Sequence, residues 1–539
     1  MRTKVIVAIM MTMLLLTLAS VFPVKAQGTI KIGVIGPVGW PQMQGMQEGA
    51  TIAMEWINSN GGIVIDGTPY NVALSYGDEH AADMRPDLGA AEMERLCDPA
   101  RENVDFVVGG FRTECVQPIH EVAVNYHKLF FISGAATNQL IACGTGTCGK
   151  CVQCDYNKYK YMFRVTPIND TMLAYNILGF LKGYVLPYKL APLYGQQLDG
   201  DPELDIKTAV IAEDLDWTIN MYNMFVYGGY LGPQANIVYS ARTPWNALDF
   251  SSYLDAMHAA GVRLIVHIFS ASASMAFITQ LAGHQLKAVA AGIDVLGQMS
   301  DFWTWTGGKS QYEAFLASTG TRSPISETSV PYTTTQFWDV YYARFGHAPI
   351  YTAWGVYDSI IAMRETLQSH SIHPPFDQAK TDLLVPIVEQ TDRVGTLGRF
   401  KYTTVHDVFS NEFGSTWTQG YVRAVWAQWQ QGRLEVVWPM DRAYSKMYVL
   451  PSVSGKMYPY PTDVNQDGKI DVLDIATVGY AFGSKPEAQS VPPHPRWQFA
   501  ADVDRSKLID GNDNTMVCYD FDKIVDLPLL YGDEAGHLH

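Results

Sequence analysis

The chain has 539 residues, 47% of them hydrophobic, and a formal net charge of −16 at pH 7. This length predicts two or more domains, and the apolar content is sufficient for sizeable cores, which excludes a disordered chain. The acidic balance argues against nucleic-acid binding, because such binding depends on Lys and Arg residues that neutralise phosphates.

Residues 1–26 have the pattern of a secretory signal peptide. Arg2 and Lys4 form a basic start, an almost wholly apolar run follows, and a small residue stands at Ala26, where a signal peptidase would cut. An uncleaved membrane anchor is the alternative, because the apolar run is close to the length that spans a bilayer. Cleavage is the favoured interpretation, and since no Cys follows the run, we expect an exported chain without a lipid anchor.

Short apolar runs alternate with amphipathic stretches along most of the remaining chain. The runs that predict strands are residues 29–37, 70–78, 104–110, 128–134, 207–214, 236–241 and 262–270. The stretches that predict helices include residues 45–62 and 250–261. One apolar face of the first helix is formed by Met46, Ala50, Ala53 and Ile57. This alternation predicts an α/β fold with parallel sheets flanked by helices, whose ligands bind beyond the carboxyl ends of the strands.

Residues 451–462 (PSVSGKMYPYPT) are rich in Pro, Ser, Tyr and Gly and are expected to form a linker. After them the composition changes to Asp-rich loops. The sequence therefore predicts a main domain over residues 27–450 and a small tail domain over residues 463–539.

Several stretches of the main domain keep the order and spacing of a known family. They include IKIGVIGPVG, VDFVVGGFRTECVQP, LFFISGAATNQL and RFGHAPIYTAWGVYDSI, and the series spans roughly residues 29–440. The series resembles the periplasmic leucine/isoleucine/valine-binding protein family, whose members are extracytoplasmic receptors for ABC importers of amino acids and amides. The resemblance implies a two-lobed periplasmic-binding-protein type I fold, with an amino-acid-like ligand trapped between the lobes and delivered to an ABC permease.

The resemblance also divides the main domain between the lobes. It places about residues 29–165 and 320–395 in lobe one, and about residues 166–319 and 396–450 in lobe two. Three crossovers of the chain would then join the two lobes.

Carried over position by position, the resemblance implies a ligand pocket at the strand ends. Its seven residues are Trp40, Thr113, Ala135, Thr137, Trp217, Ser270 and Asp294. The two threonine hydroxyls and the backbone of Ala135 would receive the polar groups of an amino acid without adding net charge. Asp294 would accept from the ligand ammonium, and the two tryptophans would cover the ligand side chain. Helix capping by the hydroxyls and ordinary packing of the tryptophans are the alternatives.

The chain departs from the family pattern around two of these positions. Ser270 stands where an aromatic residue is common. Arg112 and Glu114 flank Thr113 where small polar residues are commoner, so either is expected to meet a polar or charged part of the ligand, or to pair with the other on the surface. These departures bear on ligand specificity rather than on the fold.

Four of the seven cysteines form one cluster, CGTGTCGKCVQC. They are Cys143, Cys148, Cys151 and Cys154. Two local disulfides are the favoured interpretation in an exported chain, and a zinc site is the alternative. Cys97 and Cys115, which bracket one expected strand, form a candidate third pair, and Cys518 is left over. Spacing alone does not determine the pairing.

The tail begins with DVNQDGKIDVLD, residues 463–474, whose oxygen-bearing residues have the offsets of a calcium-binding loop. The expected ligands are Asp463, Asn465, Asp467, Lys469 (through its carbonyl), Asp471 and Asp474. A helix is expected next, in VLDIATVGYAFG, ending at Gly483. Loop and helix resemble one half of a dockerin domain, a small all-α module with structural calcium, and Asp rather than Glu at the last ligand position fits that resemblance.

A second, irregular copy of the calcium loop follows further along the tail. Its expected ligands are Asp502, Asp504, Ser506, Asp510 and Asp513, with Asp520 and Asp522 as rival last ligands if the loop carries an insertion. A dockerin-like tail would hold the receptor at the cell surface through a cohesin-like partner, or would clamp the C-terminus. Such tails are also seen in archaeal surface proteins, so a prokaryotic cell envelope, bacterial or archaeal, is the expected setting.

The leading interpretation is a binding protein rather than an enzyme. No Ser/His/Asp or Cys/His set stands at a recognisable spacing, and the 13 His residues are scattered. His267 and His406 are expected to be structural. The alternative is an exported enzyme, or a carbohydrate- or nucleoside-binding component of a dockerin-borne surface complex.

Overall fold

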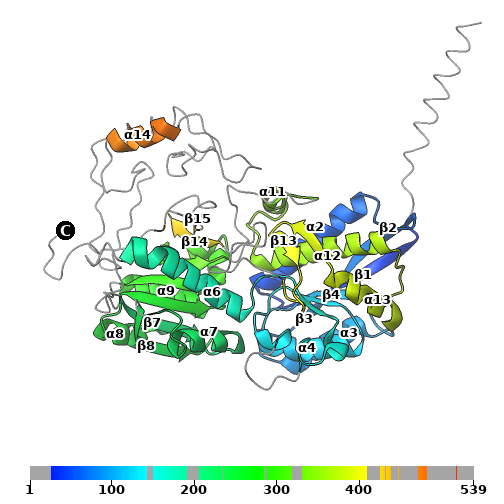
Figure 1. Ribbon diagram of the computed structural model, residues 1–539, viewed down its shortest axis with the longest axis horizontal. Helices are drawn as coiled ribbons and strands as arrows, with labels where there is room; N and C mark the ends of the chain where they lie inside the picture. The colour runs from blue at the N-terminus through cyan, green and yellow to red at the C-terminus, as the bar shows by residue number, and fades with distance from the viewer. Residues whose placement is uncertain are drawn as a thin grey trace, which may run out of the picture.

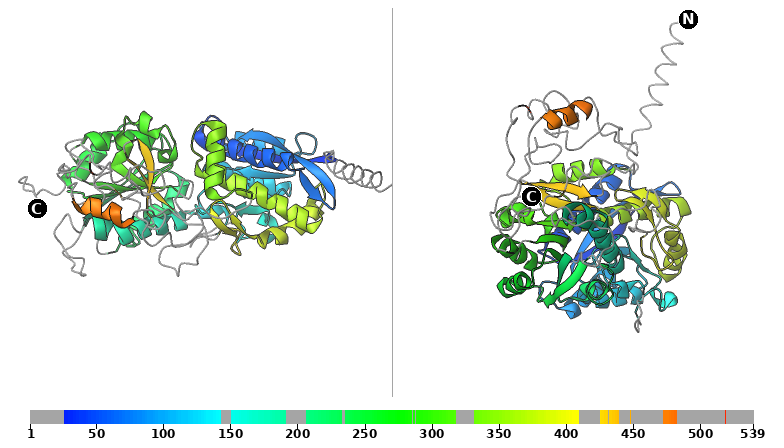
Figure 2. Two further views of the ribbon diagram at one scale, coloured as in Figure 1. Left: turned by 90° about the horizontal axis from the view of Figure 1, so that it is seen from above. Right: turned by 60° about the vertical axis from the view of Figure 1, so that its left-hand side comes forward.

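The computed structural model describes residues 26–142, 150–190, 206–232, 235–284, 286, 288–317, 331–408, 425–430, 432–438, 447, 472–481 and 518. In that part of the chain two α/β lobes lie side by side, each with helices around a central sheet (Figure 1). Figure 2 shows the same lobes from above and from the side. No helix among the described residues is long and apolar enough to cross a membrane.

Lobe one is built on a six-stranded sheet. Its strands are β1 (Gly28–Gly36), β2 (Ile63–Ile65), β3 (Thr68–Asp78), β4 (Phe106–Gly109), β5 (Phe130–Ile132) and β6 (Met162–Arg164). From edge to edge the order is β2–β3–β1–β4–β5–β6, and every neighbouring pair is parallel except β2 with β3. Because five strands are parallel, their carboxyl ends share one edge of the sheet.

Helices and a small hairpin surround this sheet. They are α2 (Pro41–Ser59), α3 (Pro86–Cys97), α4 (Thr113–Asn125), η1 (Asn138–Leu140), α5 (Tyr156–Tyr159), α11 (Thr334–Phe345), α12 (Tyr351–His370), α13 (Gln378–Glu389), β12 (Asp392–Gly395) and β13 (Gly398–Lys401). The predicted apolar face of α2 is buried, and Pro41 occupies its first turn, where no intrahelical N–H is needed. Gly49 of α2 lies so close to α12 that an added Cβ would clash with the carbonyl oxygen of Ala353. A larger residue there would push these two helices apart.

Lobe two is built on a seven-stranded sheet. Its strands are β7 (Ile206–Glu213), β8 (Ala235–Thr243), β9 (Leu264–Phe269), β10 (Val289–Asp294), β11 (Glu313–Leu316), β14 (Trp426–Gln430) and β15 (Arg433–Trp438). The order is β15–β14–β11–β10–β9–β7–β8, with β14 and β15 added as an antiparallel hairpin to five parallel strands. The helical elements are α6 (Asp170–Phe180), the π-helical η2 (Leu181–Leu190), α7 (Asp216–Val226), α8 (Ser251–Ala259), α9 (Ala273–Gly283), η4 (Leu296–Gln298), α10 (Phe302–Trp305) and η5 (Lys309–Tyr312).

The predicted α/β class with two mainly parallel sheets is confirmed. The seven predicted strand runs overlap β1, β3, β4, β5, β7, β8 and β9, and residues 250–261 contain α8. Other strands, such as β6 and β11, were not predicted from the sequence. Both are only three or four residues long and wholly buried. A short continuous apolar run lacks the alternation that distinguishes a strand from a buried helix.

The chain passes from lobe one to lobe two after β6 and returns after β11. The hairpin β12–β13 lies against lobe one, because Asp358 of α12 accepts hydrogen bonds from the backbone and the hydroxyl of Thr396, both at 3.0 Å. An isolated parallel β-bridge pairs Asp407 with Arg164, so the chain after β13 still lies beside β6 of lobe one at this point. The last crossover into lobe two therefore follows residue 408, later than the boundary at residue 396 that the resemblance implies.

The expected pair of Cys97 with Cys115 is wrong. Both thiols are free and buried, and burial raises the pKa of each to about 12. Cys97 ends α3, which leads to the amino end of β4, whereas Cys115 lies in the first turn of α4, which leaves the carboxyl end of that strand. The strand separates the two residues, and a disulfide tolerates a Cα separation of only about 7 Å.

The cysteine cluster is described only in part. Cys154 is disulfide-bonded, and its backbone N–H donates to Sγ of Cys151 at 3.3 Å. Cys143 and Cys148 lie outside the described residues. One disulfide, at Cys154, is present, but Cys151 keeps a buried thiol. Two disulfides within the cluster would need all four cysteines, so the expectation of two is wrong. In the described ranges no group of three or more His, Cys, Asp or Glu residues is placed to hold a metal ion.

One helix of the tail lies within the described residues. It is α14 (Val472–Ala481), which occupies the helix expected after the first calcium loop. Asp474 lies in its first turn and is buried. This helix stands apart from the strands and helices of the two lobes (Figures 1 and 2). The other expected calcium ligands, and residues 1–25 of the expected signal peptide, lie outside the described residues.

Candidate ligand-binding site

A cavity lies between the two lobes, where the carboxyl ends of both sheets meet. It is lined by Phe111, Arg112, Gly134, Ala136, Ile168, Leu173, Leu215, Trp217, Ser270, Ile293, Val295, Gln298, Leu316 and Tyr351. Its empty volume, which includes the open space at the mouth, is about 520 Å³. The lining is mostly apolar and includes a few polar side chains. The strand alternation predicted a site at this edge.

Glu79 shapes the wall on lobe one. This buried residue follows β3 and accepts hydrogen bonds from the backbone N–H groups of Phe111 at 2.7 Å and Arg112 at 2.9 Å. Burial raises the pKa of Glu79 to about 7. The two bonds hold the loop after β4, so that Phe111 and Arg112 both line the cavity.

Arg112 brings a guanidinium into this wall. The residue is only 3% exposed. Its guanidinium lies over the ring of Trp40 at 5.2 Å from the centroid and over the ring of Trp245 at 4.8 Å. Trp40 follows β1 in lobe one and Trp245 follows β8 in lobe two, so these cation–π contacts join the lobes. Trp40 itself does not line the cavity, and it contacts the cavity residue Arg112 instead.

Glu114 also connects the lobes. Its Oε1 accepts a hydrogen bond from the backbone N–H of Asp216 at 2.9 Å, in the first turn of α7. Because Arg112 is buried, the expected surface pair of Arg112 with Glu114 is wrong. Thr113 lies between them and begins α4, and its buried hydroxyl has no hydrogen-bond partner among the described residues.

Glu213 organises the wall on lobe two. This buried residue ends β7 and accepts hydrogen bonds from Nε1 of Trp217 at 2.7 Å, from the backbone N–H of Ser270 at 3.0 Å, and from the Ser270 hydroxyl. Burial raises the pKa of Glu213 above its usual value. These bonds hold Trp217 and Ser270 in the lining, where the resemblance implies both should be.

Asp294 lies at the end of β10, and the residues on either side of it line the cavity. Its own Oδ1 accepts hydrogen bonds from the backbone N–H groups of Leu296 at 2.9 Å and Gly297 at 3.1 Å. Burial, and then the charge of Glu313, raise the pKa of Asp294 well above its usual range. The structure thus places this carboxyl in the core behind the cavity, and its contact with a ligand ammonium stays a prediction.

A buried cluster of ionisable groups lies beside Asp294. Nε2 of His267 stands 2.8 Å from Oε2 of Glu313. Burial lowers the pKa of His267 to about 4 and raises the pKa of Glu313 to about 8. Both directions favour the uncharged forms of the two groups.

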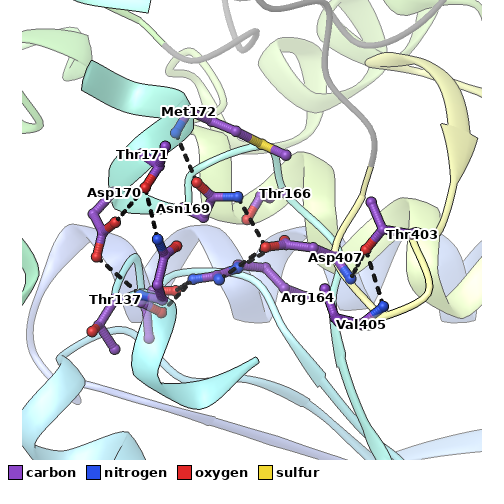
Figure 3. A network of polar contacts seen from close by, with 12 residues as sticks. Thr137, Arg164, Thr166, Asn169, Asp170, Thr171, Met172, Thr403, Val405 and Asp407 are labelled. Atoms are coloured by element: carbon purple, nitrogen blue, oxygen red, sulfur yellow. Dashed lines mark hydrogen bonds and ion pairs between the residues drawn. The ribbon is translucent and has the colours of Figure 1, made fainter. Parts of the chain in front are cut away.

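Ala135 and Thr137 belong to the loop after β5, which Arg164 holds in place. Nη1 of Arg164 donates hydrogen bonds to the carbonyl oxygens of Ala135 at 3.0 Å and Thr137 at 2.8 Å. Its Nε and Nη2 donate to Asp407 (Figure 3). The Thr137 hydroxyl accepts from the backbone N–H of Gln139 and so caps η1. The residues on either side of Ala135 line the cavity.

The same network continues across the first crossover between the lobes. Asn169 donates from Nδ2 to Asp407 at 3.0 Å and accepts at Oδ1 from the backbone N–H of Met172 at 2.7 Å, which caps α6 (Figure 3). Asp170 accepts from the backbone N–H of Asn138 at 3.0 Å. The start of lobe two is therefore tied to two loops of lobe one.

Comparison with known proteins agrees with this architecture. Residues 29–381 match the family described as periplasmic binding protein. The chain belongs to this family. Its members are solute-binding receptors that act outside the cytoplasm of prokaryotes with ABC permeases, rather than enzymes. No curated protein sequence matches the chain.

Solved structures share the fold at low sequence identity. A protein from Silicibacter pomeroyi, described as a branched-chain amino acid ABC transporter, has a TM-score of 0.63 at 16% identity over 79% of this chain and 100% of its own. A solute-binding protein from R. palustris, in complex with benzoate, has a TM-score of 0.55 at 13% identity over 80% of this chain and 100% of its own. A leucine-binding protein from Thermotoga maritima has a TM-score of 0.55 at 16% identity over 76% of this chain and 97% of its own.

Three residues that support the lining were not selected from the sequence. Glu79 and Glu213 stand at the carboxyl ends of apolar strand runs, and that position is a signal for a residue near a site in a parallel sheet. Arg164 ends the short strand β6, where a buried arginine requires a partner. Its partner is too distant in the sequence for a local pattern to indicate it.

Proposed function

We propose that this protein is the solute receptor of an ABC importer, and that it captures an amino acid or a related small organic acid or amide between its lobes. The observation that carries the proposal is the cavity at the strand ends, which is lined by residues of both lobes. A ligand in such a cavity contacts both lobes only when they are closed, so binding favours the closed state.

The ionisable groups around the cavity support recognition of a ligand. Glu79 and Glu213 direct their carboxyl groups to N–H groups of the loops that line the cavity. Asp294 does the same for the turn that follows β10. Such bonds fix the shape of the walls, which a preformed ligand site requires.

The composition of the lining favours a ligand with an apolar body. Its aromatic side chains are those of Phe111, Trp217 and Tyr351, and most of the others are aliphatic. Amino acids such as leucine are the first candidates, since the Thermotoga maritima protein of the same fold is a leucine-binding protein. Aromatic acids are the second, since the R. palustris protein was solved with benzoate.

For the tail we propose two calcium loops that order a dockerin-like module and hold the receptor on an archaeal cell surface through a cohesin-like partner. Asp463, Asn465, Asp467, Lys469, Asp471 and Asp474 would hold the first ion. The fit is supported by α14, which begins at Val472 and buries Asp474, the last expected ligand of this loop, in its first turn. Calorimetric titration of calcium into the chelated protein tests this, and the Asp463→Ala/Asp467→Ala double variant should lose one binding event.

A thermal-shift screen of residues 27–539 tests the receptor function. The protein is unfolded to remove any bound molecule and refolded with calcium, and the panel holds amino acids, short amides, aromatic acids, sugars and nucleosides. A ligand that binds only the folded state raises Tm with its concentration. A shift with an amino acid, amide or organic acid supports the proposal. A shift only with sugars or nucleosides contradicts the ligand class, and no shift contradicts the receptor function.

A further inference from the structure

Arg112 is a buried cation at the cavity wall that lacks a close counter-ion among the described residues. It lines the cavity, and the residue is 3% exposed. Of its guanidinium nitrogens, Nη1 lies 3.7 Å from Sδ of Met84, while Nε and Nη2 are shielded from water and have no hydrogen-bond partner in the described part of the chain. A buried charge of this kind is costly unless an anion pairs with it.

The nearby buried carboxyl groups are already engaged. Glu79 accepts from two backbone N–H groups, and Glu213 accepts from Trp217 and Ser270. Burial raises the pKa of both carboxyl groups, to about 7 for Glu79, and the charge of Arg112 opposes this rise in each. Neither group is hydrogen-bonded to the Arg112 guanidinium, whose Nε and Nη2 have no partner among the described residues.

The two nitrogens without partners form one edge of the planar guanidinium. The Nε and Nη2 edge presents two parallel N–H donors, and this geometry matches the two oxygens of a carboxylate. The chain uses the same edge elsewhere, because Nε and Nη2 of Arg164 donate to the two oxygens of Asp407 at 2.9 and 3.0 Å. Arg112 has the same two donors available.

Two tryptophan rings fix the plane of the Arg112 guanidinium. Trp40 belongs to lobe one and Trp245 to lobe two, and the guanidinium contacts both. Opening of the lobes would move Trp245 away and uncover the guanidinium. Closure after ligand entry would then seal an ion pair in a water-poor site, where such a pair is strong.

We propose that the ligand is a carboxylate with an apolar body, and that its carboxylate pairs with Nε and Nη2 of Arg112. The inference rests on the proposed receptor function and narrows its ligand class. Leu215, Ile293 and Leu316 of lobe two, with their neighbours in the lining, receive the apolar body. The anchor for the carboxylate is thus a charged fork rather than the threonine hydroxyls that the family resemblance implies, and an ammonium group on the ligand is not required.

Isothermal titration calorimetry of ligand-stripped residues 27–539 with matched probes tests this inference. The probes are 4-methylpentanoate, 4-methylpentanamide, leucine, benzoate and benzamide. Of 4-methylpentanoate and benzoate, we expect the one that binds more tightly to exceed its own amide by about 100-fold in affinity. The amide cannot form the two charge-assisted hydrogen bonds to the guanidinium. Arg112→Gln should abolish this difference, and Arg112→Lys, which keeps the charge but not the fork, should lie between. Thr113→Val should change the affinity for the acids less than Arg112→Gln does.

The matched control is Arg344→Gln. Arg344 also lies over an aromatic ring, that of Phe345 at 5.3 Å, but it is on α11 and does not line the cavity. Its replacement should leave all affinities unchanged. Circular dichroism and Tm establish that each variant is folded.

The outcomes separate this inference from the receptor function. Leucine binding that is equally tight in wild type and Arg112→Gln overturns the inference and leaves the receptor function in place. If the wild type binds none of the probes and no compound of the wider screen, both the inference and the receptor function are contradicted. If Arg112→Gln does not fold, the affinities of the wild type for each acid and its amide test the inference. Equal affinities for acid and amide overturn it.

Discussion

The guanidinium of Arg164 donates two hydrogen bonds to the carboxylate of Asp407, a residue 243 positions later in the chain. Both side chains are buried, and Arg164 also donates to the carbonyl oxygens of Ala135 and Thr137. The pair therefore links the last segment of lobe one to the loop that lines the cavity (Figure 3). We therefore expect ligand binding and stability to depend on the same contact.

Asp407→Ala is expected to lower the free energy of unfolding by ~3–5 kcal/mol, because it leaves the Arg164 charge buried without its partner. The ligand affinity should fall as well, since the loop at Ala135 loses its support. Urea unfolding and calorimetric titration measure the two effects. Asp87→Ala is the control, because its ion pair with Arg85 is exposed and should contribute less than about 1 kcal/mol. Equal costs for the two variants would contradict this role.

Glu79→Gln removes one of the two oxygens that accept from the loop after β4. We expect a loss of ~1–3 kcal/mol in the free energy of unfolding. Ligand affinity should decrease, because Phe111 and Arg112 are then held less firmly in the cavity wall. Glu94→Gln, at an exposed position on α3, should change neither quantity. If Glu79→Gln has the stability and the ligand affinity of the wild type, Glu79 is not needed to position the loop after β4.

The Glu313 carboxyl is expected to make the protein less stable as pH rises. Burial raises the pKa of Glu313 to about 8 in the folded protein. The stability linked to its protonated form is fully present below the pKa of the unfolded chain, and it is lost as the pH rises through about 8. His267 has a pKa lowered to about 4, so it makes the protein more stable as pH rises. This effect ends at its unfolded pKa of about 6.5. Tm should therefore fall between about pH 6.5 and 8.5.

Glu313→Gln tests this dependence, since an amide does not titrate. Its Tm should decline less than that of the wild type over the same pH interval. Asp87→Asn is the control, because the pKa of Asp87 is lowered by Arg85 and this carboxyl titrates below the interval. A decline as steep in Glu313→Gln as in the wild type would assign the effect to other groups, such as Glu79.

Cys97 and Cys115 should behave as unreactive thiols in the folded protein. Both are buried, and a pKa of about 12 leaves almost no thiolate at neutral pH. Iodoacetamide should label neither residue under native conditions and both in denaturant without a reductant. Peptide mass spectrometry reads the labels, and a peptide pair cross-linked through these two residues would contradict the structure.

The position of the site followed from features that a sequence displays directly. Runs such as β7 and β9 are mainly apolar segments. Trp217 and Ser270 stand soon after their ends and were placed near the ligand for that reason and by the family resemblance. Both line the cavity. In a parallel sheet the strand ends meet at one edge, so local patterns are sufficient to locate such residues.

The direction of each side chain did not follow from those patterns. Asp294 also ends a strand, yet its Oδ1 turns to the backbone of the next turn. Arg112 was expected near a ligand or on the surface, and its burial depends on Trp40 and Trp245, which are far from it in the sequence. Contacts between distant segments leave no periodic signal, so they are seen only in the folded chain.

Hydrogen exchange with and without the strongest ligand of the thermal-shift screen tests the central claim most directly. If the lobes close over the ligand, amides of residues 111–113 and 134–137 in lobe one and of residues 215–217 and 293–298 in lobe two should all exchange more slowly. These segments carry most of the cavity lining. Protection confined to one lobe, or absent from both, would contradict capture of the ligand between them.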